Sequence, residues 1–340
     1  MSQEMKASFV TKDHKIYAGT APMPVPDADQ VLVKVAAVGV CGSDVHFFRH
    51  GSIGHMVVEN DLILGHEMSG IITAVGTDVD PSRIGQRVAV EPQRSCRVCA
   101  QCKAGRYNLC PNIEFYAAPP INGAFAEYVT IQSDFAFEIP DHVSFGAAAL
   151  IEPLSVCIAS AQKAEITVGS RVLIAGAGPI GVIMAQVARA FGASEIFITD
   201  ISQDRRNFAL KYGATHALDA ATADLNGLDV DAFIDASGVA SAVYSGIKAV
   251  GPNGRAILVG MGSDDVLMPV SYIQWKEIIV TGIFRYVNTW PLGIELVASG
   301  KVDLDVLITH TFGLDQVEDA LNAPRLPGAL KPVVEPNGKL

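Results

Sequence analysis

The sequence predicts a two-domain α/β protein whose second domain alternates strands and helices. The chain has 340 residues, which suits about two domains with substantial cores. Its composition changes near Pro153, beyond which short β-rich runs alternate with helical ones. In this second part a strand at 171–175 leads into the glycine-rich run Gly176 to Gly181, and a helical pattern follows. Together these observations predict βαβ units and a parallel sheet.

Overall composition narrows the class of protein. Hydrophobic residues make up 49% of the chain and charged residues 18%, which predicts a globular protein rather than a disordered one. The net charge of −11 argues against nucleic acid or an anionic membrane as a partner, because both select basic surfaces. The start of the chain has no signal-peptide pattern, and the longest apolar run, 172–185, is too short to span a membrane. We therefore expect a cytoplasmic protein.

The first chemically unusual stretch follows an apolar, β-branched run at 31–40. Cys41 comes directly after this expected strand, with Ser43 two residues on and His46 five residues on. Taken alone, a cysteine here is most often a small buried apolar residue. If a helix begins at this point, Ser43 lies beside Cys41 at its mouth and His46 lies one turn further.

His66 and Glu67 stand at the head of the pattern G-H-E-x2-G-x5-G-x2-V. The glycines mark tight backbone positions in an otherwise strand-like run. A lone histidine is usually a satisfied core residue, but thiol, imidazole and carboxylate together are ligands that zinc prefers. Cys41, His66 and Glu67 therefore form a candidate three-ligand zinc site, with a fourth position left for water or substrate.

Four more cysteines lie within 15 residues, in a segment at about 91–112 that also holds four cations. In a large intracellular chain this spacing indicates a metal site rather than disulfides. Four thiolates suit a closed structural zinc site or an iron–sulfur cluster. The nearby cations are expected to offset the thiolate charge. The cysteines are Cys96, Cys99, Cys102 and Cys110, and the cations are Arg94, Arg97, Lys103 and Arg106.

Glu152 is a lone carboxylate in the apolar, helix-like run 147–157. Such a group is costly to bury unless it is paired or bound to metal. A capping or salt-bridging glutamate ahead of Pro153 is the alternative.

The run Gly176 to Gly181 reads G-x-G-x-x-G in the context that gives this motif its meaning. A strand precedes it, a helix with Pro179 in its first turn follows, and Asp200 ends a second strand 19 residues beyond Gly181. The predicted ligand is a dinucleotide whose pyrophosphate rests on the helix N-terminus. Asp200 should accept hydrogen bonds from ribose hydroxyls and repel a 2′-phosphate, which favours NAD over NADP. Arg205 and Arg206 keep NADP open, although a solvated helix face explains them more simply.

Two later segments complete the expected site. Strands ending at Asp235 and near Val259 should present their loops to the cofactor, because ligands bind at the carboxyl ends of parallel strands. The segment F-R-Y-V-N-T-W at 284–290 carries Arg285 and Tyr286, whose alternative explanation is a surface arginine and a half-buried tyrosine.

Taken together, C-G-S-D-x-H, G-H-E-x2-G-x5-G-x2-V and the four-cysteine segment resemble the zinc-dependent medium-chain dehydrogenase/reductase family. The motifs I-E-P-L-S-V and F-R-Y-x-N-T-W, with Phe115, resemble its polyol (sorbitol and xylitol) dehydrogenases. The resemblance covers essentially the whole chain. It implies a GroES-like, mostly-β catalytic domain at 1–153 and 287–340, and a Rossmann NAD-binding domain with a doubly wound six-stranded parallel sheet at 154–286.

The resemblance also implies roles for individual residues. Cys41, His66 and Glu67 surround a catalytic zinc ion with Glu152 as a ligand or a water-mediated neighbour, and which glutamate binds directly stays open. Ser43, His46 and Glu152 form the catalytic set. The implied substrate-binding residues are Ser43, Phe47, Phe115, Glu152, Arg285 and Tyr286. The implied cofactor-binding residues are Gly176, Gly178, Pro179, Ile180, Gly181, Asp200, Arg205, Val259, Gly260, Met261 and Arg285.

The expected activity is NAD-dependent oxidation of a secondary alcohol of a polyol to a ketose, with two zinc ions per chain and a homotetramer or homodimer as the assembly. Phe47 stands where relatives commonly have tyrosine, and Ala118 lacks a possible hydroxyl, so the contacts to the substrate chain can differ. The alternatives are another zinc alcohol dehydrogenase, such as a threonine or butanediol dehydrogenase, and, from a different class, a non-catalytic NAD- or zinc-binding regulator.

Overall fold

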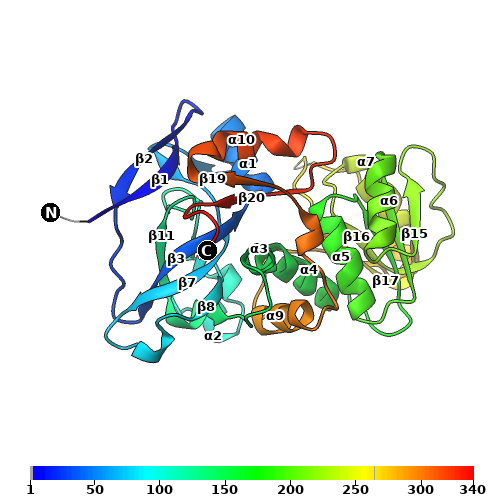
Figure 1. The fold of residues 1–340 in the computed structure, drawn as a ribbon. Coiled ribbons are helices and arrows are strands. Elements are labelled where there is room, and N and C mark those ends of the chain that lie inside the picture. Colours follow the sequence, from blue (N-terminus) through cyan, green and yellow to red (C-terminus); the bar gives the residue numbers. More distant parts are fainter. Residues whose placement is uncertain (1–2, 264) are drawn as a thin grey trace. The chain divides into compact units, whose positions relative to one another are not determined.

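The structure, a computed structural model, describes residues 3–263 and 265–340 (Figure 1). The chain divides into two compact units. The first joins Met1–Glu152 with Trp290–Ala298 and Leu304–Leu340, and the second joins Pro153–Thr289 with Ser299–Asp303. These limits lie within a few residues of the domains expected from the sequence, except that the short segment Ser299–Asp303 returns to the second unit.

A mixed sheet organises the first unit around the strand β3 (Gln30–Gly39). Among the described residues the order is β12-β8-β7-β3-β20-β19, and β11 also pairs with β3. Nine of the ten residues of β3 are buried, as its run of valines and alanines requires for a strand covered on both faces. The other strands are β7 (Glu67–Val75), β8 (Arg87–Val90), β11 (Tyr128–Gln132), β12 (Ala136–Glu138), β19 (Ile308–Gly313) and β20 (Lys331–Glu335).

Smaller elements surround this sheet. A three-stranded sheet has the order β2-β1-β6, and the pairs β9–β10 and β4–β5 form short ribbons. Their bounds are β1 (Glu4–Val10), β2 (Ile16–Pro22), β4 (Ser52–Ile53), β5 (Met56–Val57), β6 (Leu62–Ile63), β9 (Gln93–Arg94) and β10 (Glu114–Phe115). The helices are α1 (Gly42–His50), α2 (Ala100–Lys103), α3 (Phe145–Ala149), α9 (Trp290–Ala298) and α10 (Val317–Asn322). Six 3-10 turns complete the described part: η1 (Pro81–Arg83), η2 (Tyr107–Leu109), η3 (Ser133–Phe135), η4 (Asp305–Leu307), η5 (Leu314–Gln316) and η6 (Ala323–Arg325).

Two segments differ from their sequence-based expectation. The helix-like run 147–157 is not one helix, because α3 ends at its C-cap Leu150 and α4 (Ile151–Lys163) begins directly afterwards. The sequence also predicts a strand over 123–131, but β11 begins only at Tyr128. The backbone N–H groups of residues 123–125 instead donate to the carbonyls of residues 63–65, so this segment supports the loop that leads to His66.

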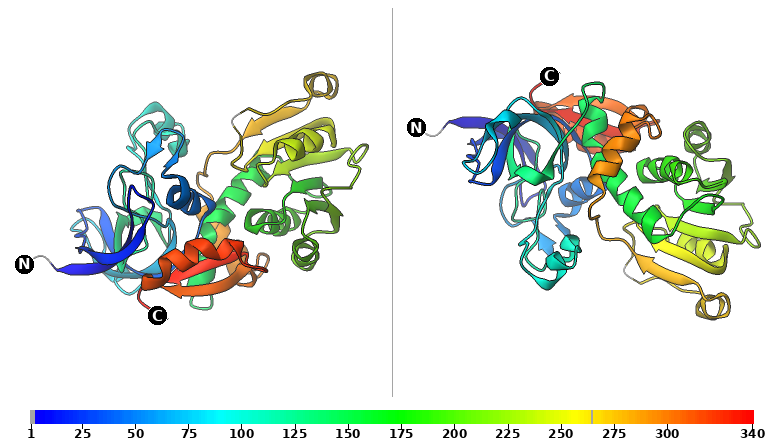
Figure 2. Two further views of the ribbon diagram at one scale, coloured as in Figure 1. Left: turned by 90° about the horizontal axis from the view of Figure 1, so that it is seen from above. Right: turned by 90° about the horizontal axis from the view of Figure 1, so that it is seen from below.

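The second unit contains a six-stranded parallel sheet with the order β15-β14-β13-β16-β17-β18 within its described residues. Helices cover both faces of this sheet (Figure 2). Its strands are β13 (Arg171–Ala175), β14 (Glu195–Asp200), β15 (His216–Asp219), β16 (Val230–Asp235), β17 (Val250–Leu258) and β18 (Ile279–Gly282). Its helices are α5 (Pro179–Ala190), α6 (Gln203–Lys211), α7 (Ala240–Lys248) and α8 (Val270–Lys276).

This strand order is the doubly wound arrangement 3-2-1-4-5-6, which confirms the predicted fold class for the second unit. The order reverses between β14 and β16, on either side of the first strand β13. In such sheets the ligand crevice lies at the carboxyl ends of the strands at this reversal. In the part of the chain that the structure describes, no helix combines the length and hydropathy needed to cross a bilayer.

Candidate functional site: a Cys-His-Glu group, a four-cysteine lobe and a dinucleotide cavity

Strand pairing in the first unit brings Cys41, His66 and Glu67 together. Gly39 at the end of β3 pairs with Glu67 at the start of β7, so the residues that follow one strand meet those that open the other. Cys41 is the N-cap of α1 and has extended backbone angles, which turn the chain from strand into helix. One ligand atom from each of the three residues lies within 4.8 Å of the others. Thiol, imidazole and carboxylate at this separation suit a single zinc ion.

Asp44 orients this group, although sequence reasoning assigned no role to it. Its Oδ2 accepts the backbone N–H of Cys41 at 2.9 Å, and its Oδ1 accepts that of Gly65 at 3.0 Å. The same Oδ1 lies 3.5 Å from Nδ1 of His66, and both side chains are buried. A carboxylate on one ring nitrogen fixes the tautomer of a histidine and leaves the other nitrogen to a metal. The only sequence signal for this role was the position of Asp44 within the motif C-G-S-D-x-H.

The charges around His66 and Asp44 favour binding of a cation. Burial by itself lowers the pKa of His66, but the charges of Asp44 and Cys41 outweigh it and raise that pKa well above 6.5. For Asp44, burial by itself raises the pKa. The charge of His66 and hydrogen bonds from two backbone N–H groups lower it by more, so the pKa of Asp44 falls below 3.8. A metal ion competes with a proton for the same imidazole nitrogen and thiolate.

Lys331 is a second residue that sequence reasoning missed. Its Nζ lies 2.5 Å from Oε1 of Glu67 and donates to the carbonyl of Val40 at 2.9 Å, with both charged side chains buried. Burial lowers the pKa of Lys331, but the charges of Glu67, Cys41 and Glu152 raise it above 10.5, so the ammonium stays charged. Lys331 and Glu67 are 264 positions apart in the sequence, so no local pattern could indicate this contact.

The other oxygen of Glu67 is a direct indication of a missing ligand. Oε2 is buried and has no hydrogen-bond partner among the described residues. A buried carboxylate oxygen without a partner is unfavourable, and a metal ion would satisfy it. Gly39 leaves the room for this oxygen, because a Cβ at residue 39 would lie 2.1 Å from it. The residues present therefore fit a zinc ion.

Other predicted residues of the first unit lie around this group. Phe115 on β10 is largely buried, and its ring centroid is 5.3 Å from that of His66. Glu152, in the first turn of α4, is 5% exposed and contributes to the raised pKa of Lys331. Ser43 and His46 lie on α1, where His46 is exposed and its ring is 4.6 Å from that of His50.

Phe47 is deeply buried, and its contact with a substrate stays a prediction. Its side chain is 3% exposed and packs in the core beneath α1. The period of the helix explains this, since Phe47 follows His46 by one residue and therefore points away from it toward the sheet.

The four-cysteine lobe has the geometry of a single tetrahedral metal ion. The Sγ atoms of Cys96 and Cys110, and those of Cys99 and Cys102, are 3.5 Å apart, and those of Cys96 and Cys102 are 3.9 Å apart. Zinc–sulfur bonds of ~2.3 Å in a tetrahedron place the sulfur atoms about 3.8 Å apart. A polynuclear iron–sulfur cluster holds its thiolates on different irons and therefore farther apart. All four cysteines are unbridged.

The local surroundings change the pKa values of two of these cysteines in opposite directions. Hydrogen bonds from the backbone N–H groups of Val98 and Cys99 lower the pKa of Cys96 to about 6, whereas burial raises that of Cys102 to about 11. The neighbouring cations are only in part available to offset thiolate charge. Arg97 pairs with Asp134 at 2.6 Å, and Arg94 lies 3.9 Å from Glu114.

The glycine-rich run of the second unit has the predicted form. Gly176 has φ +95 and Pro179 opens α5, whose N-cap is Gly178. A Cβ on Gly181 would lie 1.8 Å from the carbonyl oxygen of Gly176, so only glycine permits this close turn. Both carboxylate oxygens of Asp200 accept backbone N–H groups, from Ala177 and Ser202, each at 2.8 Å. Asp200 thereby joins the glycine-rich loop to the end of β14.

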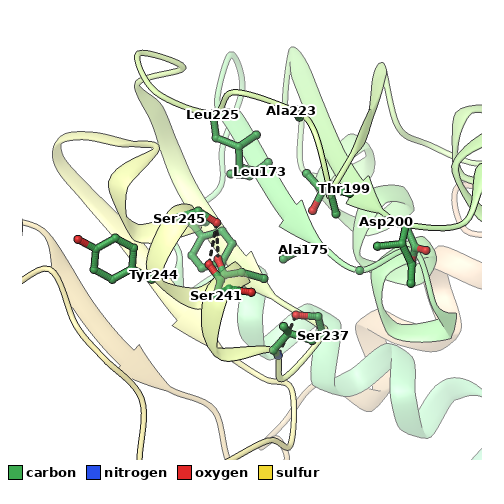
Figure 3. Close-up of a pocket in the computed structure, with 18 of the residues that line it drawn as sticks. Leu173, Ala175, Thr199, Asp200, Ala223, Leu225, Ser237, Ser241, Tyr244 and Ser245 are labelled. Carbon is green, nitrogen blue, oxygen red and sulfur yellow. Dashed lines mark hydrogen bonds between the residues drawn. The ribbon is translucent and has the colours of Figure 1, made fainter.

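A cavity of about 830 Å³ opens beside this loop. Gly176, Gly178, Asp200 and Arg205 line one part of it. The loop after β16, which the sequence predicted to face the cofactor, also lines the cavity, through Ala236 and Ser237. The loop after β15 and α7 line it as well, and sequence reasoning did not identify these two elements. Figure 3 shows Asp200 and Thr199 on one side, Ala223 and Leu225 above, and Ser237, Ser241 and Ser245 across the space. The volume suits an organic ligand.

Arg206 corrects one sequence-based interpretation. It is not on a solvated helix face, because it is 7% exposed, donates to the carbonyl of Asp200 at 2.7 Å and lies 3.1 Å from Asp219. It therefore supports the end of β14, while Arg205 lines the cavity.

The loop at 259–262 packs against the loop at 235–238. A Cβ on Gly260 would lie 2.1 Å from the backbone nitrogen of Gly238, and Met261 is exposed. Pro179, Ile180, Gly181, Val259, Gly260 and Met261 do not line the described cavity. In the same unit Arg285 has φ +56, and its guanidinium lies 4.7 Å from the ring centroid of Phe284. Tyr286 is 1% exposed, so it is more deeply buried than a half-buried surface tyrosine.

Comparisons with known proteins agree with this geometry. Residues 27–141 match the family "Alcohol dehydrogenase GroES-like domain", and residues 179–299 match "Zinc-binding dehydrogenase". The chain is 43% identical to a sorbitol dehydrogenase of Bacillus subtilis, over 94% of this chain and 93% of that one. It is 39% identical to a probable D-xylulose reductase A of Aspergillus clavatus, over 96% of each.

Solved structures show the same similarity. A putative zinc-binding dehydrogenase from Sinorhizobium meliloti, bound to NADP, is 31% identical, with a TM-score of 0.91 over 98% of this chain and 100% of that one. An alcohol dehydrogenase from Escherichia coli complexed with NADH is 29% identical, with a TM-score of 0.91 over the same shares. The ligand set, the doubly wound sheet and these matches together identify the chain as an oxidoreductase of the zinc-binding alcohol dehydrogenase family.

Proposed function

We propose that this protein oxidises a secondary alcohol of a polyol to a ketose, reversibly, with NAD as hydride acceptor. The observation that supports this most is the group of Cys41 with the buried His66 and Glu67, whose ligand atoms lie within 4.8 Å of one another. Three protein ligands suit a catalytic zinc, because they leave a coordination position for the substrate. The relatives named as sorbitol dehydrogenase and D-xylulose reductase support a polyol as the substrate.

In this proposal Cys41, His66 and Glu67 hold the catalytic zinc, which when bound lowers the pKa of the substrate hydroxyl. Lys331 keeps Glu67 in place and balances part of the local negative charge. Ser43, in the first turn of α1, accepts the hydroxyl proton and passes it toward the exposed His46, from which solvent removes it. Glu152 lies near the metal and is the alternative ligand to Glu67.

The proposed substrate-binding residues are Phe115, Glu152, Arg285 and Tyr286. Phe115 lies against His66 and excludes water from one side of the metal group. Arg285 has a positive φ, a backbone conformation that residues other than glycine rarely adopt. Such conformations concentrate at functional sites.

The dinucleotide is proposed to occupy the cavity beside Gly176 and Gly178, with its pyrophosphate on the N-terminus of α5. Asp200 disfavours a 2′-phosphate by charge, which supports NAD. The half-buried Arg205 on the same cavity is the feature that favours NADP instead. The two units would then divide the work, with metal and substrate in the first and the cofactor in the second.

The assembly is proposed to be a homotetramer or homodimer. β18 is the last strand of its sheet and therefore presents an unpaired edge. Exposed apolar residues accompany this edge: Leu267, Val270, Trp275 and Ile279, with Trp275 84% exposed. Exposed apolar residues beside a strand edge support association. The cytoplasmic location expected from the sequence stays a prediction.

The test is a substrate panel with NAD reduction as the readout. We expect turnover of sorbitol, xylitol, galactitol or arabinitol to exceed that of butanediol, threonine and ethanol. Faster oxidation of threonine or butanediol than of every polyol would assign the chain to the nearest alternative. The absence of turnover on all of them, with NAD and zinc still bound, would support a non-catalytic regulator.

Metal analysis provides an independent check. Two zinc ions per chain are expected, one at each candidate site. One zinc per chain would restrict the metal to the four-cysteine lobe, and iron with visible absorbance would point to an iron–sulfur cluster.

A further inference from the structure

Glu91 is a buried carboxyl group that the proposed mechanism does not use. It follows β8, its side chain is fully buried, and it does not belong to either cluster of candidate metal ligands. Burial raises the pKa of Glu91 to about 7, even though hydrogen bonds from Gln93 and Tyr107 act in the opposite direction. The negative charges of Asp134 and Glu152 add to the increase. This carboxyl group therefore changes its protonation near neutral pH.

The contacts of Glu91 connect separate parts of the first unit. Nε2 of Gln93 donates to its Oε1 at 2.6 Å, and Gln93 is itself fully buried. The backbone N–H of Glu91 donates to the carbonyl of Phe135 at 2.9 Å, and the ring of Tyr107 lies 5.6 Å from that of Phe135. Glu91 therefore has partners on β9 through Gln93, on η2 through Tyr107 and on η3 through Phe135.

A short path leads from this carboxyl group to the candidate metal ligands. Gln93 pairs with Phe115 in the β9–β10 ribbon. The ring of Phe115 in turn lies 5.3 Å from that of His66. Because Gln93 and Phe115 face each other in this ribbon, we expect a change in the hydrogen bond between Glu91 and Gln93 to move Phe115.

We propose that Glu91 is a positioning residue, which through Gln93 and the β9–β10 ribbon sets how the ring of Phe115 lies against His66. This inference rests on the proposed function only for its effect on substrate, since the effect on Phe115 itself needs no substrate.

The protonation state decides how firmly the ribbon is held. The neutral carboxyl group is suited to its dry surroundings, whereas the carboxylate is penalised by burial and repelled by Glu152. The ionisable groups that face it are Tyr107 from η2, Asp134 from η3 and Glu152 from α4. Glu67 stands on β7, one position beyond the paired residues Met68 and Val90. We therefore expect Phe115 to shift as the pH passes through 7.

The experiment places 4-fluorophenylalanine at position 115 of the full-length protein and follows its ¹⁹F resonance from pH 6 to pH 9. The wild-type resonance should titrate near pH 7. In Glu91→Gln, which mimics the neutral carboxyl group, that titration should disappear. Glu114→Gln is the matched control, because Glu114 is an exposed carboxylate directly beside Phe115, and it should keep the titration.

Steady-state kinetics of the zinc-loaded variants provide the second readout. The KM for the best polyol should vary through pH 7 in the wild type and become flat in Glu91→Gln, with kcat within about twofold. Glu91→Leu, which cannot hold Gln93, should raise KM several-fold at every pH.

Three outcomes would overturn the proposal. The first is a wild-type ¹⁹F resonance that does not titrate. This outcome can be observed even if none of the variants folds. The second is a titration that persists in Glu91→Gln, and the third is its loss in Glu114→Gln. If the titration disappears in Glu91→Gln but the wild type oxidises no polyol, the positioning role stands and the proposed substrate class fails.

Discussion

The two candidate metal groups of the first unit are built in opposite ways. The lobe takes four thiols from within 15 residues, and its own backbone N–H groups donate to the sulfurs of Cys99 and Cys110. The other group takes its ligands from the ends of two strands and depends on Asp44, on Lys331 from β20, and on the space left by Gly39. Local spacing specifies the first group, whereas the whole sheet specifies the second.

The difference extends to chemistry. Four thiolates complete a tetrahedron, so a metal in the lobe has no position for a substrate. The Cys41 group offers three ligand atoms, one of them a carboxylate oxygen without a partner in the described part of the chain. A closed site contributes to folding and an open one to catalysis. Substitutions should therefore separate the two groups by the property that each one affects.

The largest expected effect is on catalysis. Cys41→Ser should reduce kcat/KM at least a thousandfold, which corresponds to about 4 kcal/mol of lost transition-state stabilisation. NAD binding and the melting temperature should change little, and metal analysis should find one zinc per chain. If this variant keeps wild-type turnover, the open site is not at Cys41.

The lobe should respond in the opposite sense. Cys99→Ser should lose the other zinc, lower the melting temperature and expose 96–110 to proteolysis, because folding of this segment and metal binding are linked. Molecules that remain folded should still turn over substrate. Cys157→Ser, which changes a buried cysteine outside both groups, is the control and should keep both metal ions. Loss of turnover in proportion to zinc lost from the lobe would show that the two groups are not separable.

Lys331 tests the dependence of the open site on distant sequence. Lys331→Met should destabilise the metal-free protein by about 3–5 kcal/mol, because it leaves the buried Glu67 without its ion partner. The double variant Lys331→Met/Glu67→Gln should recover much of this loss. Lys276→Met removes an ion pair of the same 2.5 Å length that is far more exposed, and should cost about 1 kcal/mol or less. Chemical denaturation measures all three, and equal losses for the two lysines would contradict the comparison.

Asp44 should have the smallest effect. Asp44→Asn should weaken zinc binding at the open site about 10–100-fold, as measured by chelator competition, because it removes the carboxylate that orients His66. Asp80→Asn, a similar change at an exposed carboxylate that caps η1, should leave zinc affinity unchanged.

Asp44 also makes the stability of the metal-free protein depend on pH, in a direction that follows from the pKa of His66. The folded-state pKa of His66 is raised, so its protonation stabilises the metal-free fold below pH ~6.5, and this contribution is lost as the pH rises through the higher folded-state value. Asp44→Asn should flatten that curve. An unchanged curve would mean that Asp44 does not control His66.

What could be predicted from the sequence follows the same division. The lobe and the glycine-rich loop are short patterns, so their residues could be recognised at fixed spacing and their strand and helix context checked directly. Lys331 and Glu91 could not, because a lysine in a C-terminal strand and a glutamate after β8 carry no local signal. Each becomes informative only when β20 or the β9–β10 ribbon is placed beside the metal group. Arg206 was misjudged because its partner Asp219 comes from the next strand, and the run 147–157 because nothing in its alanines marks the break at Leu150.

The separation of Glu67 and Lys331 along the chain also sets an order of events during synthesis. A ribosome adds about 5–20 residues per second, so the lobe from Cys96 to Cys110 is complete roughly 1–3 s after its first cysteine is made. The 264 residues from Glu67 to Lys331 require roughly 15–50 s at the same rate. A nascent chain can therefore acquire metal in its lobe long before β20 exists to seat Glu67.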